Sequence, residues 1–213
     1  MRASVGSMVS IDPSAVLWSA PERERADRPL LVLLHGYGSH EGDLFSLAPH
    51  LPLAPVIASV RAPVQEGPGY AWFPVGGSTD RIALANSAAA AVVSWISSLS
   101  YTSVGLLGFS QGGATALQVM RQAPALVSYG VMLSGFALPD PQPGDAELAA
   151  SRPPVFWGRG TADQVIQPAF IDHTSDWLPA HSTLTERIYE DLPHSISNAE
   201  LADVNSFIQE QLL

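Results

Sequence analysis

Residues 103–118 read SVGLLGFSQGGATALQ and combine an apolar run, a glycine-rich turn and a run of small residues. The apolar positions 104, 106, 107 and 109 are typical of a strand buried on both faces of a parallel sheet. The small residues after the turn have a helical pattern. Strand, Gly-x-Ser-x-Gly and helix in this order predict a nucleophile elbow with Ser110 at its apex.

A steric argument explains the glycines of this turn. A turn this tight brings the flanking positions so close that a side chain at either would clash, which accounts for Gly108 and Gly112. Ser110 is then pushed out over the N-terminus of the following helix, where the dipole and the free N–H groups favour negative charge. The alternative is an idle serine in a glycine-rich turn. A base, an acid and an oxyanion site elsewhere in the chain would decide between the two.

The composition limits the possible classes of protein. The 213 residues suffice for one domain spanning 1–213, and 46% apolar with 14% charged residues is typical of a globular chain. There is no Cys, which excludes disulfides, a thiolate nucleophile and Cys-ligated metal. All ten basic residues are Arg, so a Ser-Lys dyad and a Schiff base are excluded too.

The charge and hydropathy patterns predict the surroundings of the protein. A net charge of −10 disfavours nucleic acid and anionic membrane surfaces as partners. No stretch approaches the ~20 apolar residues of a membrane span, and the first 20 residues lack a signal-peptide core. We therefore expect a cytoplasmic protein without stable membrane insertion, either a monomer or a homodimer. No His-rich ligand spacing appears, so we expect neither a metal nor another cofactor.

Strand and helix patterns alternate along the whole chain. Strands are predicted at 16–19, 30–34, 55–60, 104–109, 127–133, 155–157 and 184–189, and helices at 43–51, 80–99, 168–178 and after a capping box at 197–200. This alternation predicts an α/β fold whose mostly parallel central sheet carries helices on both faces. Residues 61–77 read as a loop. The Pro-rich segment 139–154, with a short helix near 147–150, is too small for a large cap domain.

An acid and a histidine follow two of the later strands. A serine nucleophile needs a base, and the base needs a carboxylate on its other nitrogen. Ser110, Asp163 and His194 occur in the order serine, acid, histidine, each after a predicted strand. Ligands of such sheets bind at the carboxyl ends of the strands. We therefore predict that these three residues form a catalytic triad.

Other acids and histidines fit less well. Asp191 lies on the same loop as His194 and is too close along the chain, and Asp172 falls inside a predicted helix. A surface aspartate in a turn is the alternative for Asp163, and a capping or surface residue is the alternative for His194. The remaining histidines are expected at the surface or in structural roles; they are His35, His40, His50, His173 and His181.

The sequence His35-Gly36-Tyr37-Gly38 supplies the remaining part of a hydrolytic site. A tetrahedral intermediate carries an oxyanion that needs preorganised donors. The backbone N–H of Gln111 can be one donor. The N–H of Tyr37 can be the second, because the two glycines let this loop curl toward Ser110.

These motifs resemble the small serine esterases of the α/β-hydrolase fold, in the phospholipase/carboxylesterase family that includes acyl-protein thioesterases. The resemblance covers most of the chain and rests on LLHGYG at 33–38, RAP with AWF at 61–73, GFSQGG at 108–113, the Gly-x-x-Asp at 160–163 and LPHSI at 192–196. The family implies ester or thioester hydrolysis without a cofactor. By the same analogy Trp72 and Phe73 would line the acyl site, or else anchor their loop.

The chain departs from the thioesterase branch at three positions, Tyr37, Ser39 and Pro74. The expected activity is therefore a general carboxylesterase acting on small-molecule esters of short to medium acyl chains. An acyl-thioesterase or lysophospholipase would use the same triad. A non-catalytic binding protein of this fold is the alternative from another class.

Overall fold

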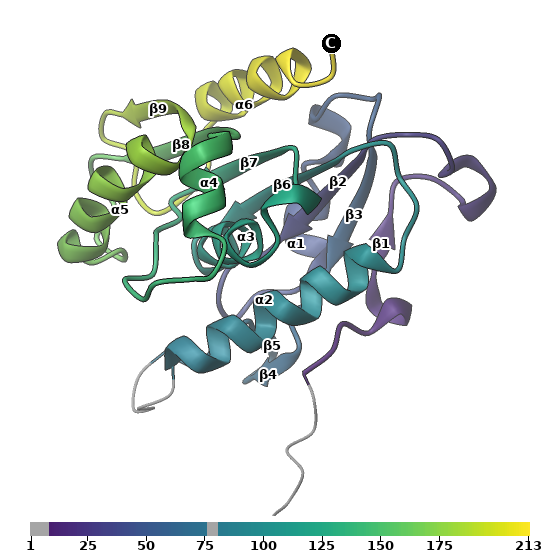
Figure 1. Ribbon diagram of the computed structural model, residues 1–213, viewed down its shortest axis with the longest axis horizontal. Helices are drawn as coiled ribbons and strands as arrows, with labels where there is room; N and C mark the ends of the chain where they lie inside the picture. Colours follow the sequence, from purple (N-terminus) through teal and green to yellow (C-terminus); the bar gives the residue numbers. More distant parts are fainter. Residues whose placement is uncertain (1–8, 76–80) are drawn as a thin grey trace, which may run out of the picture.

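A computed structural model describes residues 9–75 and 81–213 of the chain. A seven-stranded sheet with the order β1-β3-β2-β6-β7-β8-β9 forms its centre (Figure 1). The strands are β1 Leu17–Trp18, β2 Leu30–Leu34, β3 Val56–Val60, β6 Val104–Phe109, β7 Tyr129–Leu133, β8 Pro154–Gly160 and β9 Thr183–Tyr189. Neighbouring strands run parallel except β1, which pairs antiparallel with β3. The predicted α/β architecture is confirmed.

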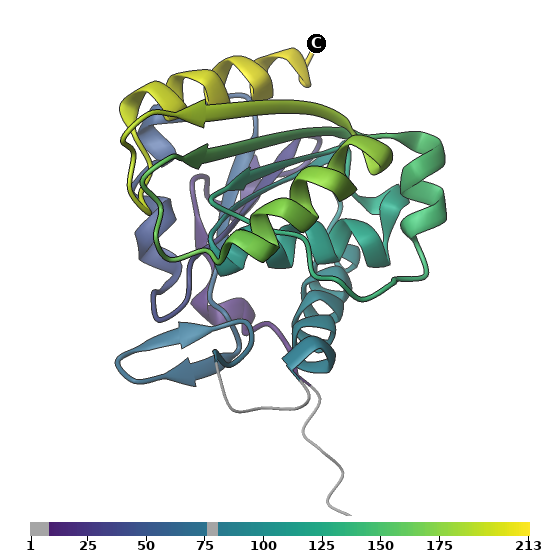
Figure 2. The ribbon, with the colours of Figure 1, turned by 90° about the vertical axis from the view of Figure 1, so that its left-hand side faces the viewer.

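Helices cover both faces of this sheet, as Figure 2 shows. One apolar cluster packs α1 (Glu41–Phe45) and α6 (Asn198–Glu210) against one face. The other cluster packs α2 (Arg81–Ser97), α3 (Gln111–Gln122), α4 (Asp145–Ser151) and α5 (Pro168–His181) against the opposite face. Every residue of β2, β3 and β7 is buried, which explains their continuous apolar sequences.

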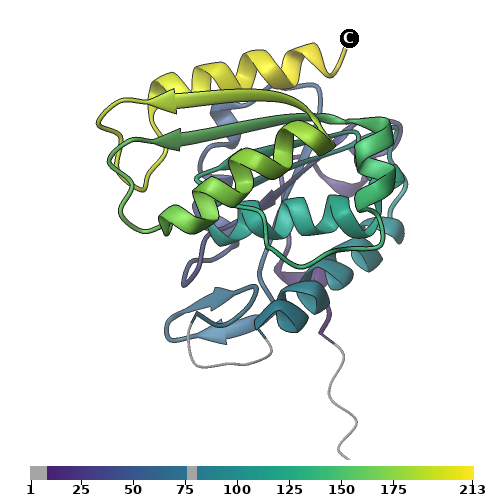
Figure 3. The ribbon, with the colours of Figure 1, turned by 60° about the vertical axis from the view of Figure 1, so that its left-hand side comes forward.

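Two predicted segments differ in detail. The apolar stripe at 43–51 divides into α1 and a 3-10 turn, Ala48–His50, because Pro49 has no amide N–H with which to continue the helix. The loop at 61–77 contains a hairpin, β4 (Val64–Glu66) and β5 (Gly69–Ala71), which stands apart from the main sheet (Figure 3). Its turn uses Gly67 at φ 56°. Gly76, Gly77 and the predicted helix start at Asp80 lie outside the described residues.

The segment that could have held a cap is short and is held in place by a buried arginine. Arg121 of α3 is 1% exposed and binds both carboxylate oxygens of Asp145. Its guanidinium also donates to the backbone carbonyls of Leu138 and Asp140 and lies over the ring of Trp177. Residues 134–153 thus form only α4 and its connections, and the prediction of no large cap domain is confirmed.

The predicted capping box at 197–200 forms by half. The Ser197 side chain accepts a hydrogen bond from the backbone N–H of Glu200 at 3.1 Å. The Glu200 side chain does not return to Ser197 but is buried against Gly158 of β8, and neither carboxylate oxygen has a hydrogen-bond partner in the described chain. The helix start was therefore predicted correctly, whereas the position of the Glu200 carboxyl was not.

Candidate active site

Ser110 stands at the turn between β6 and α3 in a conformation that side chains rarely adopt. Its φ is 55° and its ψ is −120°. The Ser110 N–H donates to the carbonyl of Leu133 at 2.8 Å, so the strained turn is tied to the neighbouring strand β7. The predicted elbow geometry is therefore present around Ser110.

The glycines of the elbow are required by close backbone contacts. A Cβ on Gly112 would overlap the carbonyl oxygen of Leu34, and one on Gly108 would overlap the carbonyl oxygen of Gly112. Both contacts are with backbone atoms, which cannot move aside without distorting the sheet. The steric reason predicted for these two glycines agrees with the structure.

Asp163 and His194 meet at the carboxyl ends of β8 and β9, whose arrows point to the same edge of the sheet (Figure 2). The His194 Nδ1 and Asp163 Oδ2 atoms are 2.7 Å apart, and the Asp163 side chain is 3% exposed. The other Asp163 oxygen accepts the backbone N–H groups of Val165 at 2.8 Å and Ile166 at 3.2 Å. Burial raises the pKa of Asp163, but the hydrogen bonds from His194 and these two amides outweigh it and leave the pKa below its usual value.

The imidazole of His194 lies beside the elbow. Its ring centroid is 4.8 Å from that of Phe109, the residue before Ser110. Because ionised Asp163 accepts from Nδ1–H, the second nitrogen, Nε2, is the one left for chemistry. The hydrogen bonds of the described residues include the Asp163–His194 pair but none between Ser110 Oγ and His194. Such contacts are often long without substrate and tighten when it binds.

The competing residues are occupied elsewhere. Asp191 and Asp172 are exposed. His40 caps α1, and His181 stacks on Trp177 with its Nδ1 2.8 Å from the Trp177 carbonyl. His35 is fully buried; its Nε2 accepts the N–H of Ala62 at 3.1 Å, and burial lowers its pKa. None of these contacts places a second base beside Ser110.

The loop 35–38 approaches the elbow as predicted. A methyl group on Gly36 would lie 3.7 Å from the Cβ of Ser110. Tyr37, Ser110 and Gln111 line one cavity together. Gln111 is the first residue of α3, where a backbone N–H has no acceptor within the helix. The two predicted oxyanion donors and the serine thus share one space.

This cavity, which we call the acyl cavity, measures about 190 Å³ and is mainly apolar. Phe73 lines it, but Trp72 does not: the Trp72 indole is buried and donates to the His35 carbonyl at 2.8 Å. Trp72 therefore has the alternative role considered for the pair, anchoring of the loop. The Gln111 side chain helps, accepting from Trp72 N–H at 2.8 Å and donating to the Phe73 carbonyl at 2.6 Å.

Further residues of the acyl cavity escaped the sequence analysis. They are Val75, Arg81, Phe136, Val165, Ile166, Gln167 and Phe170. Phe136 lies just after β7, and Val165 and Ile166 lie in the loop after β8. Each follows the carboxyl end of a strand, so that rule could have pointed to them.

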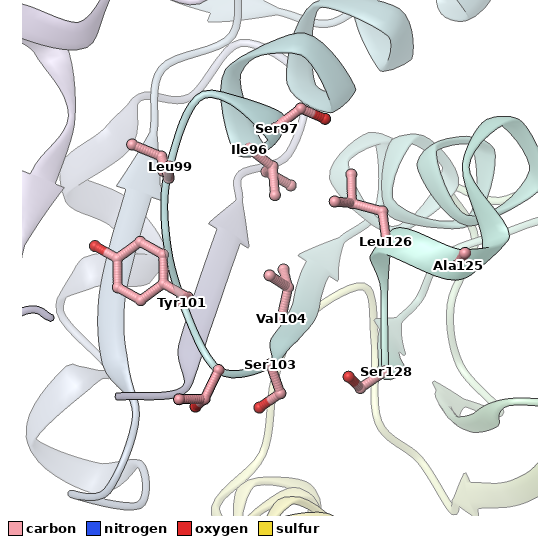
Figure 4. Close-up of a pocket in the computed structure, with 10 residues that line it drawn as sticks. Ile96, Ser97, Leu99, Tyr101, Ser103, Val104, Ala125, Leu126 and Ser128 are labelled. Carbon is pink, nitrogen blue, oxygen red and sulfur yellow. The ribbon is translucent and has the colours of Figure 1, made fainter. Parts of the chain in front are cut away.

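Two more cavities lie near the sheet. The first, which we call the α1 cavity, measures about 280 Å³, and its wall includes His194 and Phe109 together with residues of α1. The second, of about 420 Å³, is at the other end of the sheet, where Ile96, Val104 and Leu126 come from α2, β6 and the turn before β7 (Figure 4). It contains no residue of the predicted triad.

Searches for other kinds of site give no candidates in the described ranges 9–75 and 81–213. No group of three or more His, Asp or Glu side chains there could hold a metal ion. Within the same ranges no helix has the length and hydropathy needed to span a bilayer.

Comparison with solved structures shows the class of protein. The structure of acyl-protein thioesterase 2 from Zea mays matches this chain with a TM-score of 0.75 and 24% identity, over 93% of this chain and 99% of that one. This likeness shows the α/β-hydrolase fold.

Comparison with sequences shows the family. The model of the phospholipase/carboxylesterase family matches residues 19–212, and the chain belongs to that family. Acyl-protein thioesterase 1 of Debaryomyces hansenii is 33% identical over 108 residues, which are 49% of this chain and 47% of the relative. Carboxylesterase SOBER1 of Arabidopsis thaliana is 30% identical over 117 residues, 50% and 48% of the two chains. The chain thus spans about half the length of the curated relatives it matches.

Proposed function

We propose that this protein is a serine hydrolase that cleaves carboxylic esters of short to medium acyl chains. The observation that carries the proposal is the buried Asp163–His194 pair, 2.7 Å apart, beside a serine held at φ 55°. Family membership and relatives called carboxylesterases support it. We also propose that residues 1–213 form one domain. A cytoplasmic location and a monomeric or homodimeric state stay predictions.

The proposed reaction divides into two acyl transfers. Ser110 Oγ attacks the ester carbonyl carbon while His194 Nε2 takes the hydroxyl proton, and Asp163 stabilises the imidazolium. The carbonyl electron pair moves to oxygen, which the N–H groups of Tyr37 and Gln111 hold. When the pair returns, the carbon–oxygen bond to the alcohol breaks, and the alcohol leaves with the proton from His194. Water, activated in the same way, then hydrolyses the acyl-enzyme.

The acyl cavity supports a limit on chain length. Its volume of about 190 Å³ is comparable to the ~150 Å³ cavity that holds a benzene ring, so it has room for about six carbons. The segment tied by Arg121 provides no lid that could open at a lipid surface. A panel of nitrophenyl esters should show falling kcat/KM beyond medium chains, without activation by micelles.

The decisive experiment combines labelling with mutation. A fluorophosphonate probe should label the wild-type chain at Ser110, and Ser110→Ala should abolish labelling and lower turnover by ~10⁶-fold. A non-catalytic binding protein would not react with the probe. Full activity in Ser110→Ala would overturn the proposal.

Thioester hydrolysis is the second candidate. Two relatives are called acyl-protein thioesterases, and the proposed triad suits either bond. Rates on an ester and a thioester with the same acyl group would separate the two activities.

A further inference from the structure

The space around His194 contains two cavities of different character. The acyl cavity includes Ser110, Tyr37 and Gln111, the residues proposed to hold the carbonyl group. The α1 cavity includes His194 and Phe109. In the proposed reaction these two sets of residues act on different parts of an ester.

Proton transfer decides which part of the substrate lies next to His194. The leaving oxygen must receive its proton from Nε2, because Nδ1 is bound to Asp163. The leaving group therefore starts at the imidazole, whereas the carbonyl oxygen faces the N–H groups of Tyr37 and Gln111. Resting on the proposed function, we propose that the α1 cavity binds the leaving alcohol and that Asp43 in its wall favours cationic over anionic alcohols.

The lining of the α1 cavity defines the chemistry of that alcohol. Leu44 is buried, Leu47 is half-buried, and Ile196 and Phe109 complete an apolar wall. These side chains suit an alcohol with a branched or several-carbon body. The cavity volume of about 280 Å³ exceeds that of the acyl cavity, so a bulky alcohol can fit.

Asp43 is the carboxylate of this wall. It is exposed, and its Oδ2 accepts the Ser39 hydroxyl at 2.6 Å, which fixes its orientation. The cavity wall contains no Arg. A cationic group at the far end of the alcohol is attracted to this carboxylate, and an anionic group is repelled. For an exposed charge pair the expected discrimination is about two- to fivefold.

The charge preference is tested with three butyrate esters, so that the acyl group stays constant. The alcohols are choline, its uncharged isostere 3,3-dimethylbutanol, and 4-hydroxybutanoate. Because these alcohols differ in intrinsic reactivity, the informative quantity is the change in their kcat/KM ratios on Asp43→Asn. We expect the choline-to-isostere ratio to fall two- to fivefold and the anionic ester to gain by a similar factor. Unchanged ratios would overturn the role of Asp43.

The assignment of the cavities is tested with a crossed pair of variants. Leu47→Trp narrows the α1 cavity and should lower kcat/KM for 3,3-dimethylbutyl butyrate relative to methyl butyrate. Val165→Trp narrows the acyl cavity and should lower kcat/KM for methyl hexanoate relative to methyl acetate. Leu53→Trp, at a residue 86% exposed and outside both cavities, is the matched control and should change neither ratio.

The outcomes separate this inference from the proposed function. A wild-type chain that neither reacts with a fluorophosphonate nor hydrolyses methyl butyrate would overturn the proposed function and this inference with it. An active enzyme in which Leu47→Trp alters the acyl series, or in which neither variant alters its own series, would overturn the cavity assignment alone.

Discussion

The Glu200 carboxyl should make the stability of this protein depend on pH near neutrality. The side chain is 1% exposed, and both its oxygens lack partners in the described chain. Burial raises the pKa of Glu200 from 4.5 to about 7, with a smaller opposing effect from the Ser197 hydrogen bond and a smaller upward effect from Asp203. Asp203 itself accepts the Tyr189 hydroxyl at 2.8 Å, which keeps its charge close by.

The direction of the effect follows from proton binding. Between pH 4.5 and about 7 the folded chain keeps a proton on Glu200 that the unfolded chain has lost. Stability therefore falls as pH rises through this window, and the loss is complete above pH 7. At 1.36 kcal/mol per pH unit, the free energy of unfolding decreases by about 3 kcal/mol from this group.

Glu200→Gln removes the titrating proton and nearly keeps the shape. Urea unfolding of both proteins from pH 4 to pH 8.5 should give a stability difference that grows with pH in favour of the variant, by about 3 kcal/mol over the range. Any fixed cost of burying the amide shifts the whole curve and leaves its slope intact. Glu210→Gln, exposed on the same helix, controls for loss of a charge. Parallel curves for Glu200→Gln and wild type would refute the reasoning.

Three further substitutions test other parts of the structure. Arg121→Met should lower the free energy of unfolding by ~3–5 kcal/mol in urea titrations, since it leaves the partly buried Asp145 carboxylate without its partner. Gly112→Ala should yield little folded protein by near-UV circular dichroism, because its Cβ overlaps the Leu34 carbonyl. Tyr37→Ala should keep kcat within ~3-fold, because only the backbone N–H of Tyr37 is proposed to act; a loss of ~10²-fold or more would contradict that role.

The parts of the fold with a local cause could be predicted from the sequence. Runs such as residues 30–34 are wholly apolar because both faces of the sheet are covered, and that pattern is visible without neighbours. The elbow at Ser110 has an equally local cause in its two glycines. The order of Ser110, Asp163 and His194 after successive strands was enough to place the acid and the base together, because parallel strands end at one edge.

Features set by long-range contacts escaped prediction. Trp72 is buried because its indole finds the carbonyl of His35, and Gln111 reaches across to the same loop, contacts that no local pattern encodes. The capping-box pattern predicted the wrong position for the Glu200 carboxyl because the space beside Gly158 was not foreseeable. The hairpin at 64–71 is too short for a periodic signal.

The arginine beneath the connection at 134–153 also constrains how this scaffold could evolve. Arg121 binds Leu138, Asp140 and Asp145 at once, so an insertion among these positions would pull its acceptors apart and leave a buried cation uncompensated. A descendant that acquired a cap domain here would have to lose or neutralise Arg121 in the same step. Growth of a cap and replacement of this one arginine are therefore coupled changes.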